Sequence, residues 1–570
     1  MMIEPWMDML TLVDVLRSYV DGSRPSSASL SIVRERGGPE AVERRSFTTA
    51  VQEALMLAAR LRAHGIRIGD VVFIAIPTSQ QFLDAWIGCV LCGALPCAIP
   101  GAEQGTTPFA RHMQAAAGAL RPVLLLTTPA VAHNTIPAFA GVASIAIEDL
   151  PDASPLDWSD VHRPLAGDLL HLQLTSGSTG VPKAAALSHR STIANVALTA
   201  RAGEADLSRD RGVLWLPLFH DMGLISLVSA LYHNCDLVLQ PPEDFIRNPL
   251  GWLRQLARQR ATTSAVPNFA LAYCVRRYRP QLMEGVDLGC LRALVVGAER
   301  VHVETLEAFA RTFAPHGFRG DAFYPCYGAA ELTLAITVPT RDKSDPLGSN
   351  IGRDIQNHEA RASSDTVLSM GRPLPSTSIV ILDEDGHSVV DGCAGQIHVR
   401  SVCMMEGYYN APEETSKVVR NGYYDTGDLG YLREGELYVL GRSKELIILR
   451  GRNYYPHEFE ECAVEHPLVD AGRVAAVAVP DAVLGTERLV LVVEPESYHA
   501  LPRLRQELQT LLRRRFGFGA NAVMFVSKGA IPRTTSRKIQ RVACAQQVAR
   551  DELVAFDGSE TAVIDTYLEA

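Results

Sequence analysis

The chain has 570 residues, of which 47% are hydrophobic and 21% are charged, and its formal net charge at pH 7 is −10. A chain of this length exceeds what one compact core supports, so we expect at least two domains. The acidic balance argues against general affinity for nucleic acid, because no excess of Lys and Arg is available to neutralise phosphates.

The first twenty residues, MMIEPWMDMLTLVDVLRSYV, place three acidic side chains before the first Arg and lack a basic start. They do not have the pattern of a signal peptide. No uncharged apolar run is long enough to cross a bilayer. The sequence therefore predicts a cytoplasmic protein without a membrane span.

Apolar strands alternate with amphipathic helices through the first two-thirds of the chain. Strands are expected at VVFIAIP from Val71, PVLLLTT from Pro122 and LRALVVGAE from Leu291. Helices are expected at AVQEALMLAARLRAHG and PLGWLRQLARQRA between such strands. This alternation predicts α/β layers with parallel sheets.

The eleven cysteines are scattered, and the closest set is Cys89, Cys92 and Cys97 in WIGCVLCGALPCAIP. The CxxC spacing of the first two is compatible with a metal or redox site. No second pair or His cluster follows, and the neighbours are apolar. A helix packed in the core, with free thiols acting as small hydrophobes, is favoured.

Three segments break the α/β pattern. Residues 341–370 are polar and turn-rich, which at this length indicates a functional or disordered segment. A Gly-Arg pair and a charge run in VLGRSKELIILRGRN are typical of a domain junction. Residues 501–541 hold ten Lys or Arg against one acid, Glu507, and LRQELQTLLRRRFGF within them has a helical apolar pattern. A basic run is usually a solvated face, but this density favours an anionic partner.

The segment LTSGSTGVPK, beginning at Leu174, combines two glycines, four hydroxyl side chains and Lys183. It is not a Walker A motif, because its Lys comes too soon after the glycines and no Ser or Thr follows. Glycines still allow close backbone approach, hydroxyls donate, and the Lys adds a fixed charge, which is the chemistry that phosphate requires. A nucleotide-binding loop is favoured over a Ser/Gly surface turn.

Further stretches follow in a fixed order, and the ordered set resembles the adenylate-forming superfamily of acyl-CoA synthetases, luciferases and peptide-synthetase adenylation domains. They are FYPCYGAAELT, YYDTGDLGYL, LGRSKELIILRGRN and IPRTTSRKIQR. Within that superfamily, LPLFHDMGL, SAVPNFALAYCVRR, VVGAERVHVETLEAFARTFAPHGF and GRNYYPHEFE resemble the fatty acyl-AMP ligase branch. The polar segment 341–370 falls where that branch carries an insertion that hinders acyl transfer to free coenzyme A.

The resemblance implies a role for each matching residue. The ATP phosphates would be held by Lys183 and by Thr175, Ser176, Gly177, Ser178, Thr179 and Gly180. Glu331 would help to hold Mg²⁺, a hard cation that prefers carboxylate oxygen. The adenine and ribose would contact Gly297, Ala298, Glu299, Tyr327, Gly328, Ala329, Asp428 and Arg442. Lys538 would bridge the carboxylate and α-phosphate oxygens, and His220 would lie near the carboxylate and gate the acyl pocket, although a structural His is nearly as good an interpretation.

Two positions depart from the family pattern. Ala330 stands where a Thr usually precedes the Glu, which removes one hydroxyl contact to the nucleotide, although the acyl-AMP ligase branch tolerates this Ala. Arg537 stands where a Gly usually precedes the Lys, and Gly permits tighter turns than Arg. Both departures, and Arg537 above all, motivate the alternative of a catalytically weakened protein that only binds nucleotide or acyl adenylate.

Other active sites find less support in the sequence. His220 and Asp221 are adjacent, and adjacent residues rarely place their side chains for a proton relay, so a hydrolase dyad is rejected. A P-loop NTPase would require hydrolysis of ATP to ADP, which we do not expect. No Gly-x-Ser-x-Gly motif or zinc-ligand spacing competes.

The resemblance implies a large N-terminal α/β domain of several subdomains at 1–440, a hinge at 441–444 that turns about Lys444, and a small mobile α+β domain at 445–570. ATP, Mg²⁺ and a fatty or other apolar carboxylic acid would give acyl-AMP in the cleft between them. An acyl-carrier protein would then accept the acyl group. An acyl- or aryl-CoA synthetase is the alternative. The basic stretch would equally suit the phosphates of coenzyme A and does not decide the acceptor, but the segment 341–370 and GRNYYPHEFE count against the synthetase.

Overall fold

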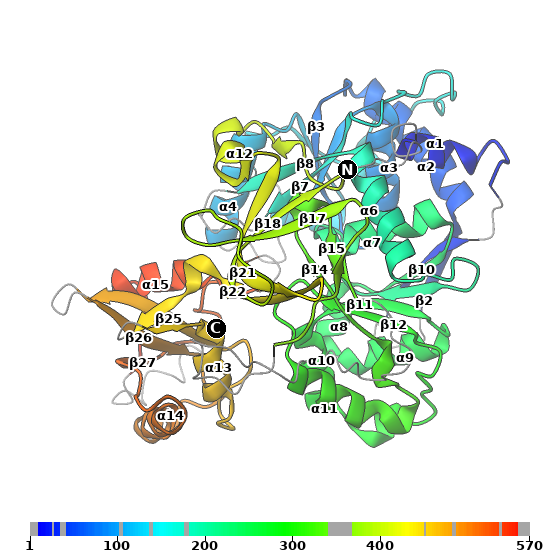
Figure 1. Ribbon diagram of the computed structural model, residues 1–570. Coiled ribbons are helices and arrows are strands. Elements are labelled where there is room, and N and C mark those ends of the chain that lie inside the picture. The colour runs from blue at the N-terminus through cyan, green and yellow to red at the C-terminus, as the bar shows by residue number, and fades with distance from the viewer. Residues whose placement is uncertain are drawn as a thin grey trace.

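The computed structural model describes residues 10–24, 28–34, 41–101, 107–135, 139, 141–175, 182–339, 367–449, 452–481, 486–534 and 538–556. A large N-terminal part carries a smaller C-terminal part against one end (Figure 1). Among these described residues, the hydrophobic clusters of the small part contain only residues from Ile447 onward, so the two parts have separate cores. The mixed α/β class expected from the sequence is confirmed.

The first large sheet is parallel except for its edge strand β2. Its seven strands run in the order β13 (Phe323–Pro325), β12 (Ala293–Gly297), β11 (Thr263–Pro267), β9 (Arg211–Leu214), β10 (Asp236–Leu239), β1 (Ser29–Arg34) and β2 (Ala41–Ser46). The connecting helices are α7 (Asp221–His233), α8 (Pro242–Arg247), α9 (Pro249–Arg258), α10 (Asn268–Arg277) and α11 (Val303–Phe313). β12 and α9 confirm one strand and one helix predicted from the sequence.

The second large sheet also has seven strands and contains the segment before the phosphate loop. Their order is β19 (Gly407–Tyr408), β8 (Lys183–Ser188), β7 (Leu169–Thr175), β4 (Leu95–Ala98), β3 (Val71–Ala75), β5 (Leu124–Thr127) and β6 (Ser144–Ala146). The helices in this part of the chain are α1 (Leu12–Ser18), α2 (Phe47–Ala63), α3 (Gln80–Cys92), α4 (Thr107–Leu120), α5 (Pro129–Thr135) and α6 (His189–Ala202). The predicted strands at Val71 and Pro122 are confirmed.

The boundaries of the predicted helices follow local capping. The helix expected near residue 50 begins earlier, as α2, because the Ser46 hydroxyl accepts a hydrogen bond from the Thr49 amide. Cys89 and Cys92 lie on buried α3, which ends at Gly93 in the left-handed region (φ 86°). Cys97 lies instead on β4 and is also a free, buried thiol.

Antiparallel strands complete the N-terminal part. One sheet contains β17 (Thr377–Leu382), β18 (Gly395–Ser401), β20 (Val419–Arg420), β21 (Tyr423–Arg433) and β22 (Glu436–Arg442). A smaller sheet contains β14 (Tyr327–Gly328), β15 (Ala335–Val338) and β16 (Arg372–Pro373), and α12 (Pro412–Val418) lies between β19 and β20 in the chain. Most of the expected insertion at 341–370 lies outside the described residues.

The C-terminal part packs helices on a three-stranded sheet (Figure 1). Its elements are β23 (Ile447–Leu449), β24 (Arg452–Tyr454), α13 (Pro456–Val464), β25 (Val474–Asp481), β26 (Thr486–Val493), α14 (Leu501–Phe516), β27 (Ala522–Phe525) and α15 (Arg541–Ala549). The predicted amphipathic helix is α14, which buries Leu504, Leu508 and Leu512. Within the described ranges, no helix is both long and apolar enough to span a bilayer.

Candidate active site

A cavity of about 980 Å³ lies between the two parts of the chain and continues into the N-terminal part. Gly297 lines it at the carboxyl end of β12, and Asp428 and Arg442 line it from β21 and β22. Lys538 lines it from the C-terminal part. Because ligands bind outside the carboxyl ends of parallel strands in open α/β sheets, this position favours a binding site.

The expected phosphate loop falls partly outside the described residues, since Ser176, Gly177, Ser178, Thr179 and Gly180 are not described. Its two ends are described: Thr175 on β7 pairs with Lys183 on the antiparallel strand β8. Both residues line the cavity. The loop between them therefore begins and ends at the cavity wall.

Lys183 is held by two acceptors of different kinds. Its ammonium forms a short ion pair with Glu414 of α12 and lies 5.3 Å from the ring centroid of Tyr408. Lys183 and Lys417 together lower the pKa of Glu414 to about 2. Only 13% of the Lys183 side chain is exposed, so this cation sits in the wall of the cavity.

Glu331 lies in the short turn Ala330–Leu332, lines the same cavity and, like Lys183, contacts Tyr408. Its Oε1 accepts a hydrogen bond from the Tyr408 hydroxyl at 2.8 Å. Its main-chain carbonyl accepts one from the Met405 amide at 2.8 Å. Side chain and backbone are therefore both fixed by the segment that leads into β19.

The geometry suits a magnesium ion held mainly by a bound triphosphate. Mg²⁺ is usually bound by one or two carboxylates together with substrate phosphates and water. Glu331 supplies one such carboxylate beside the phosphate-loop lysine, so the residues present fit the metal. Within the described ranges, the cluster with metal-ligand spacing is Asp383, Asp385 and His387, which lies in a solvent-facing turn and does not line the cavity.

Asp428 lines the same cavity, within electrostatic reach of Glu331. Its carboxylate accepts a hydrogen bond from the Tyr327 hydroxyl at 2.5 Å and lies 3.3 Å from Arg442 Nε. Burial raises the pKa of Asp428, although the charge of Arg442 and the hydrogen bond from Tyr327 oppose this. Tyr327 therefore points toward the carboxylate that is expected to hold the ribose.

Backbone packing explains why small residues occupy this wall. A Cβ at Gly328 would lie 2.0 Å from the Leu334 carbonyl oxygen, and one at Gly297 would lie 2.8 Å from that of Cys326. Ala298 has φ 64°, in the left-handed region, and lines the cavity together with Ala329. No larger side chain fits at either glycine, which leaves the space in front of the strands open.

Glu299 has a different environment from its neighbours. Its carboxylate accepts a hydrogen bond from the Phe269 amide at 2.6 Å, in the first turn of α10. Burial raises its pKa, and the positive charge of Lys538 lowers it. Glu299 is not among the residues that line the cavity, although it lies within electrostatic reach of Lys538.

Lys538 faces a group of acidic side chains from the N-terminal part. Its charge lowers the pKa of Asp221, Glu299 and Asp428 against the opposing effect of burial, which is larger in each case. Its amide donates to the Thr534 hydroxyl at 3.1 Å, and its carbonyl accepts from the Thr534 amide at 2.8 Å. These bonds close the loop that carries Lys538, while Arg537 is outside the described residues.

The turn between the two parts is fixed by ion pairs. Lys444 is exposed in the turn Ser443–Glu445 and lines the cavity. The next residue, Glu445, lies 2.9 Å from Arg541, whose guanidinium also contacts Glu460 at 2.7 Å. The candidate hinge is thus tied to the helix that follows the Lys538 loop.

His220 and Asp221 begin α7 at the cavity wall. The Asp221 carboxylate accepts a hydrogen bond from the Met222 amide at 2.7 Å, and burial raises its pKa. The His220 ring packs against Phe219 with 4.6 Å between ring centroids. The Asp221 carboxylate therefore accepts from the backbone at the start of α7, and the His220 ring has an aromatic neighbour.

Sequence reasoning missed Tyr408 and Glu414, which position Lys183 and Glu331. Both lie in GYYNAPEET, a stretch that the motif search did not select. A usable signal would have been an acidic residue in the first turn of a short helix directly after a Tyr-rich strand. Asp221 was noted in the sequence, but its proximity to Lys538 was not foreseen.

The α/β fold, with the Lys538 loop at the cavity, agrees with the class of adenylate-forming enzymes that the motifs indicate. The family described as AMP-binding enzyme matches residues 31–409. The long-chain-fatty-acid–AMP ligase FadD26 of Mycobacterium marinum is 30% identical over 588 aligned residues, covering 96% of this chain and 98% of that protein. A putative acyl-CoA synthetase of Caulobacter vibrioides is 31% identical, covering 92% and 94%.

A solved structure of McyG A-PCP complexed with phenylalanyl-adenylate superimposes with a TM-score of 0.86 at 25% identity, covering 98% of this chain and 86% of that one. The chain therefore belongs to the AMP-binding enzyme family. It is a ligase that uses ATP to form an acyl adenylate.

Proposed function

We propose that this ligase activates a fatty or similarly apolar carboxylic acid with ATP and Mg²⁺, and then transfers the acyl group to the phosphopantetheine thiol of an acyl-carrier protein. The observation that carries the proposal is the position of Lys538. This lysine of the C-terminal part lines the same cavity as Lys183, Glu331 and Asp428 of the N-terminal part. Two lysines and two carboxylates thus surround a space large enough for a nucleotide and an acid.

In the first half-reaction, a carboxylate oxygen of the acid attacks the α-phosphorus of ATP and the bond to the β-phosphate breaks. Pyrophosphate leaves with the bonding electrons. Two anions must approach each other, so catalysis depends on position and on positive charge at the developing oxygens. Lys538 would neutralise the attacking carboxylate and the α-phosphate, and Lys183 would hold the departing phosphates.

Mg²⁺, when bound, supplies positive charge to the phosphate oxygens. Glu331 would hold it together with those oxygens, and Tyr408 would keep the Glu331 carboxylate aimed at the cavity. Asp428 would accept hydrogen bonds from both ribose hydroxyls, which is a task for an ionised carboxylate. Arg442, Tyr327 and residues 297–298 and 328–329 would enclose the ribose and adenine.

In the second half-reaction, a thiol attacks the acyl carbonyl carbon and AMP leaves. We propose that the part from 445 onward then turns about Lys444 within the hinge 441–444, which withdraws Lys538 and opens a path for the thiol. Arg513 and Arg514 of α14 are exposed and supply positive charge for an acidic carrier protein. The FadD26 relative, named a fatty-acid–AMP ligase, supports the apolar acid and the free adenylate intermediate.

A CoA synthetase is the second candidate, because several similar proteins carry names of CoA synthetases or CoA ligases, and the same arginines would suit the phosphates of coenzyme A. Mass spectrometry of the purified protein with ATP, Mg²⁺, coenzyme A and a panel of acids separates the two. Accumulation of acyl-AMP without acyl-CoA supports the proposal. Efficient formation of acyl-CoA assigns the protein to the synthetase group, and absence of both products from every acid contradicts acid activation.

A further inference from the structure

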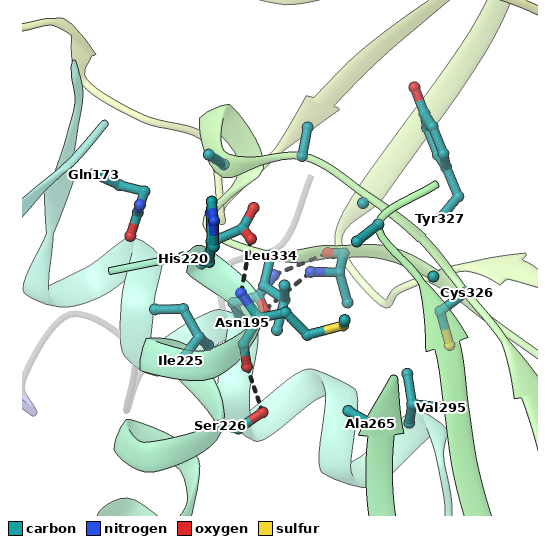
Figure 2. A pocket seen from close by; sticks show the side chains of 18 of the residues that line it. Gln173, Asn195, His220, Ile225, Ser226, Ala265, Val295, Cys326, Tyr327 and Leu334 are labelled. Carbon is teal, nitrogen blue, oxygen red and sulfur yellow. Dashed lines mark hydrogen bonds between the residues drawn. The ribbon is translucent and has the colours of Figure 1, made fainter. Parts of the chain in front are cut away.

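The segment that follows β12 leads from the cavity wall to the C-terminal part. Val295 of β12 faces the cavity next to Ala265 of the neighbouring strand (Figure 2), and Gly297 ends β12 at the cavity wall. Ala298 continues this wall with φ 64°, in the left-handed region, where the chain departs from strand geometry. Arg300 therefore comes two residues after the expected adenine wall.

The Arg300 guanidinium joins two segments that are far apart in the sequence. Its Nη1 donates a hydrogen bond to the Leu440 carbonyl at 2.9 Å, at the last residue before the expected hinge 441–444. The same nitrogen lies 3.1 Å from Nδ1 of His457, in the first turn of α13. One group thus contacts the end of the N-terminal part and the start of a helix in the C-terminal part.

The contact between Arg300 and His457 requires a neutral histidine. An arginine side chain offers only donors, so Nδ1 of His457 accepts the hydrogen bond. Burial and the charge of Arg300 lower the pKa of His457, which keeps its ring neutral at pH 7. A hydrogen bond with one charged partner is stronger than a bond between neutral groups, so this contact can contribute to how the two parts are held.

A second contact lies on the same face of α13. His302 Nδ1 lies 2.8 Å from Glu461 Oε1. His457 and Glu461 are four residues apart, so they are neighbours on the surface of the helix. Arg300 and His302 are themselves two residues apart. The short segment after the adenine wall therefore contacts one face of α13 at two points.

The hinge packs against the residues that begin α13. A Cβ at Gly441 would lie 2.7 Å from Cδ1 of Tyr455, so a larger residue there would have to displace the ring. The Tyr455 ring stacks on the His457 ring, with 5.5 Å between their centroids and 17° between their planes. Arg300, the hinge and the start of α13 therefore form one connected group of contacts.

A turn of the C-terminal part would affect the two hydrogen bonds of Arg300 differently. Leu440 precedes the hinge, so its carbonyl would stay with Arg300 when the part from 445 onward turns about Lys444. His457 lies beyond the hinge and would move away. The Leu440 carbonyl thus orients the guanidinium, while the bond to His457 belongs to the present orientation, in which Lys538 lines the cavity.

We propose that Arg300 is a positioning residue that holds the C-terminal part in the orientation for adenylation. It acts through Lys538, because the orientation that pairs Arg300 with His457 also places this lysine in the cavity. The inference rests on the proposed function, since it assumes that the C-terminal part turns about Lys444 between the half-reactions. Without the bond to His457, fewer molecules hold Lys538 in place, while the nucleotide contacts of the N-terminal part are kept.

The test compares kcat and KM in acid-dependent exchange of pyrophosphate into ATP for the wild type and Arg300→Met. We expect kcat to fall at least threefold and the KM for ATP to stay within twofold, because Arg300 does not line the cavity. A smaller change in kcat, or a KM for ATP that rises beyond twofold, overturns the inference and leaves acid activation standing. If the wild type shows no exchange with any acid, the proposed function fails and this inference fails with it.

Two substitutions of the partner separate the hydrogen bond from general damage to the fold. His457→Leu removes the acceptor and should lower kcat as Arg300→Met does, and the two together should cost no more than either alone. His457→Asn brings an amide oxygen close to the position of Nδ1 and should keep at least half of the wild-type kcat. Equal losses in both His457 variants, no loss in His457→Leu, or losses that multiply in the double variant overturn the inference.

The orientation can also be measured without turnover. Tryptic cleavage within 441–444, which contains the exposed Lys444, should accelerate at least twofold in Arg300→Met. Arg311→Met is the matched control, since this exposed arginine of α11 does not line the cavity and should leave both kcat and the cleavage rate unchanged. Cleavage of Arg300→Met at the wild-type rate overturns the inference.

Discussion

The Tyr408 hydroxyl donates a hydrogen bond to Glu331 Oε1 at 2.8 Å, and the Tyr408 ring faces the Lys183 ammonium at 5.3 Å. One tyrosine therefore positions both the expected metal ligand and the expected phosphate ligand. Burial and the neighbouring Glu331 charge raise the pKa of Tyr408, so its hydroxyl remains a donor at neutral pH.

Tyr408→Phe should lower the affinity for Mg²⁺ more than the affinity for ATP. The ring is kept, but Glu331 loses the hydrogen bond that orients it, and loss of such an outer contact typically costs about 10- to 100-fold in metal affinity. Titration of pyrophosphate release with Mg²⁺ measures the shift. Tyr423→Phe is the control, because its hydroxyl lies 3.3 Å from Ser378 and does not line the cavity. An unchanged magnesium titration would contradict the role given to Tyr408.

Lys183→Met should raise the KM for ATP about tenfold or more, because a hydrogen bond to a charged group contributes about 1.5–3 kcal/mol. Lys417→Met provides a close comparison. Lys417 contacts the same Glu414, but 64% of its side chain is exposed and it does not line the cavity. Equal effects of the two substitutions on the KM for ATP would show that the KM depends on ion pairing with Glu414 and not on phosphate binding by Lys183.

The order of motifs predicted the position of the site better than it predicted the contacts within it. Lys183, Glu331, Asp428 and Lys538 were expected together, and all four line one cavity. The contacts of Tyr408 with two of them depend on β19 pairing with β8 from more than 200 residues away. Spacing along the chain does not encode such a register.

The contacts of Glu299 also could not be predicted from the sequence, although its partner is only 30 residues away. The family resemblance implies a nucleotide contact for Glu299, whereas its carboxylate accepts a hydrogen bond from the Phe269 amide at the start of α10. The need of a helix N-terminus for an acceptor is visible only once the helix is placed beside β12. The contacts of Arg300 with Leu440 and His457 likewise required the structure.

Asp428→Asn should weaken ATP binding without lowering the stability of the fold. Burial raises the pKa of Asp428, so its contribution to stability is present below the ordinary aspartate pKa and is lost as the pH rises through the raised value. At pH 7 the variant should therefore have an equal or higher melting temperature without ATP, while its KM for ATP rises about 10- to 100-fold. A clearly lower melting temperature with an unchanged KM would assign Asp428 a structural role instead.

Arg276→Gln should loosen the contact between the two parts. Arg276 forms a short ion pair with Asp470 and lies 3.6 Å from Glu496, while His302 lies 2.8 Å from Glu461. An exposed pair contributes about 0.2–1 kcal/mol, so proteolysis at residues 441–444 should accelerate about 1.4- to fivefold. Arg319→Gln, at a pair within the N-terminal part, should leave the rate unchanged.

The same contact should respond to acid. Burial alone would raise the pKa of Glu461, but the hydrogen bond and charge of His302 lower it. The contribution of Glu461 to the contact is therefore present above the ordinary glutamate pKa and is lost as the pH falls through the lowered value. Hinge proteolysis by an acid-active protease should accelerate in that range, and a constant rate would contradict this contribution.

The most direct test of the whole account is acid-dependent exchange of labelled pyrophosphate into ATP by the wild type and by Lys538→Ala. We predict exchange that requires a carboxylic acid in the wild type and falls at least about 100-fold in the variant, in the range found when a group stabilising transition-state charge is removed. Lys528→Ala, an exposed lysine of the same part that does not line the cavity, should exchange normally. Undiminished exchange by Lys538→Ala would contradict the assignment of this lysine to the adenylation step.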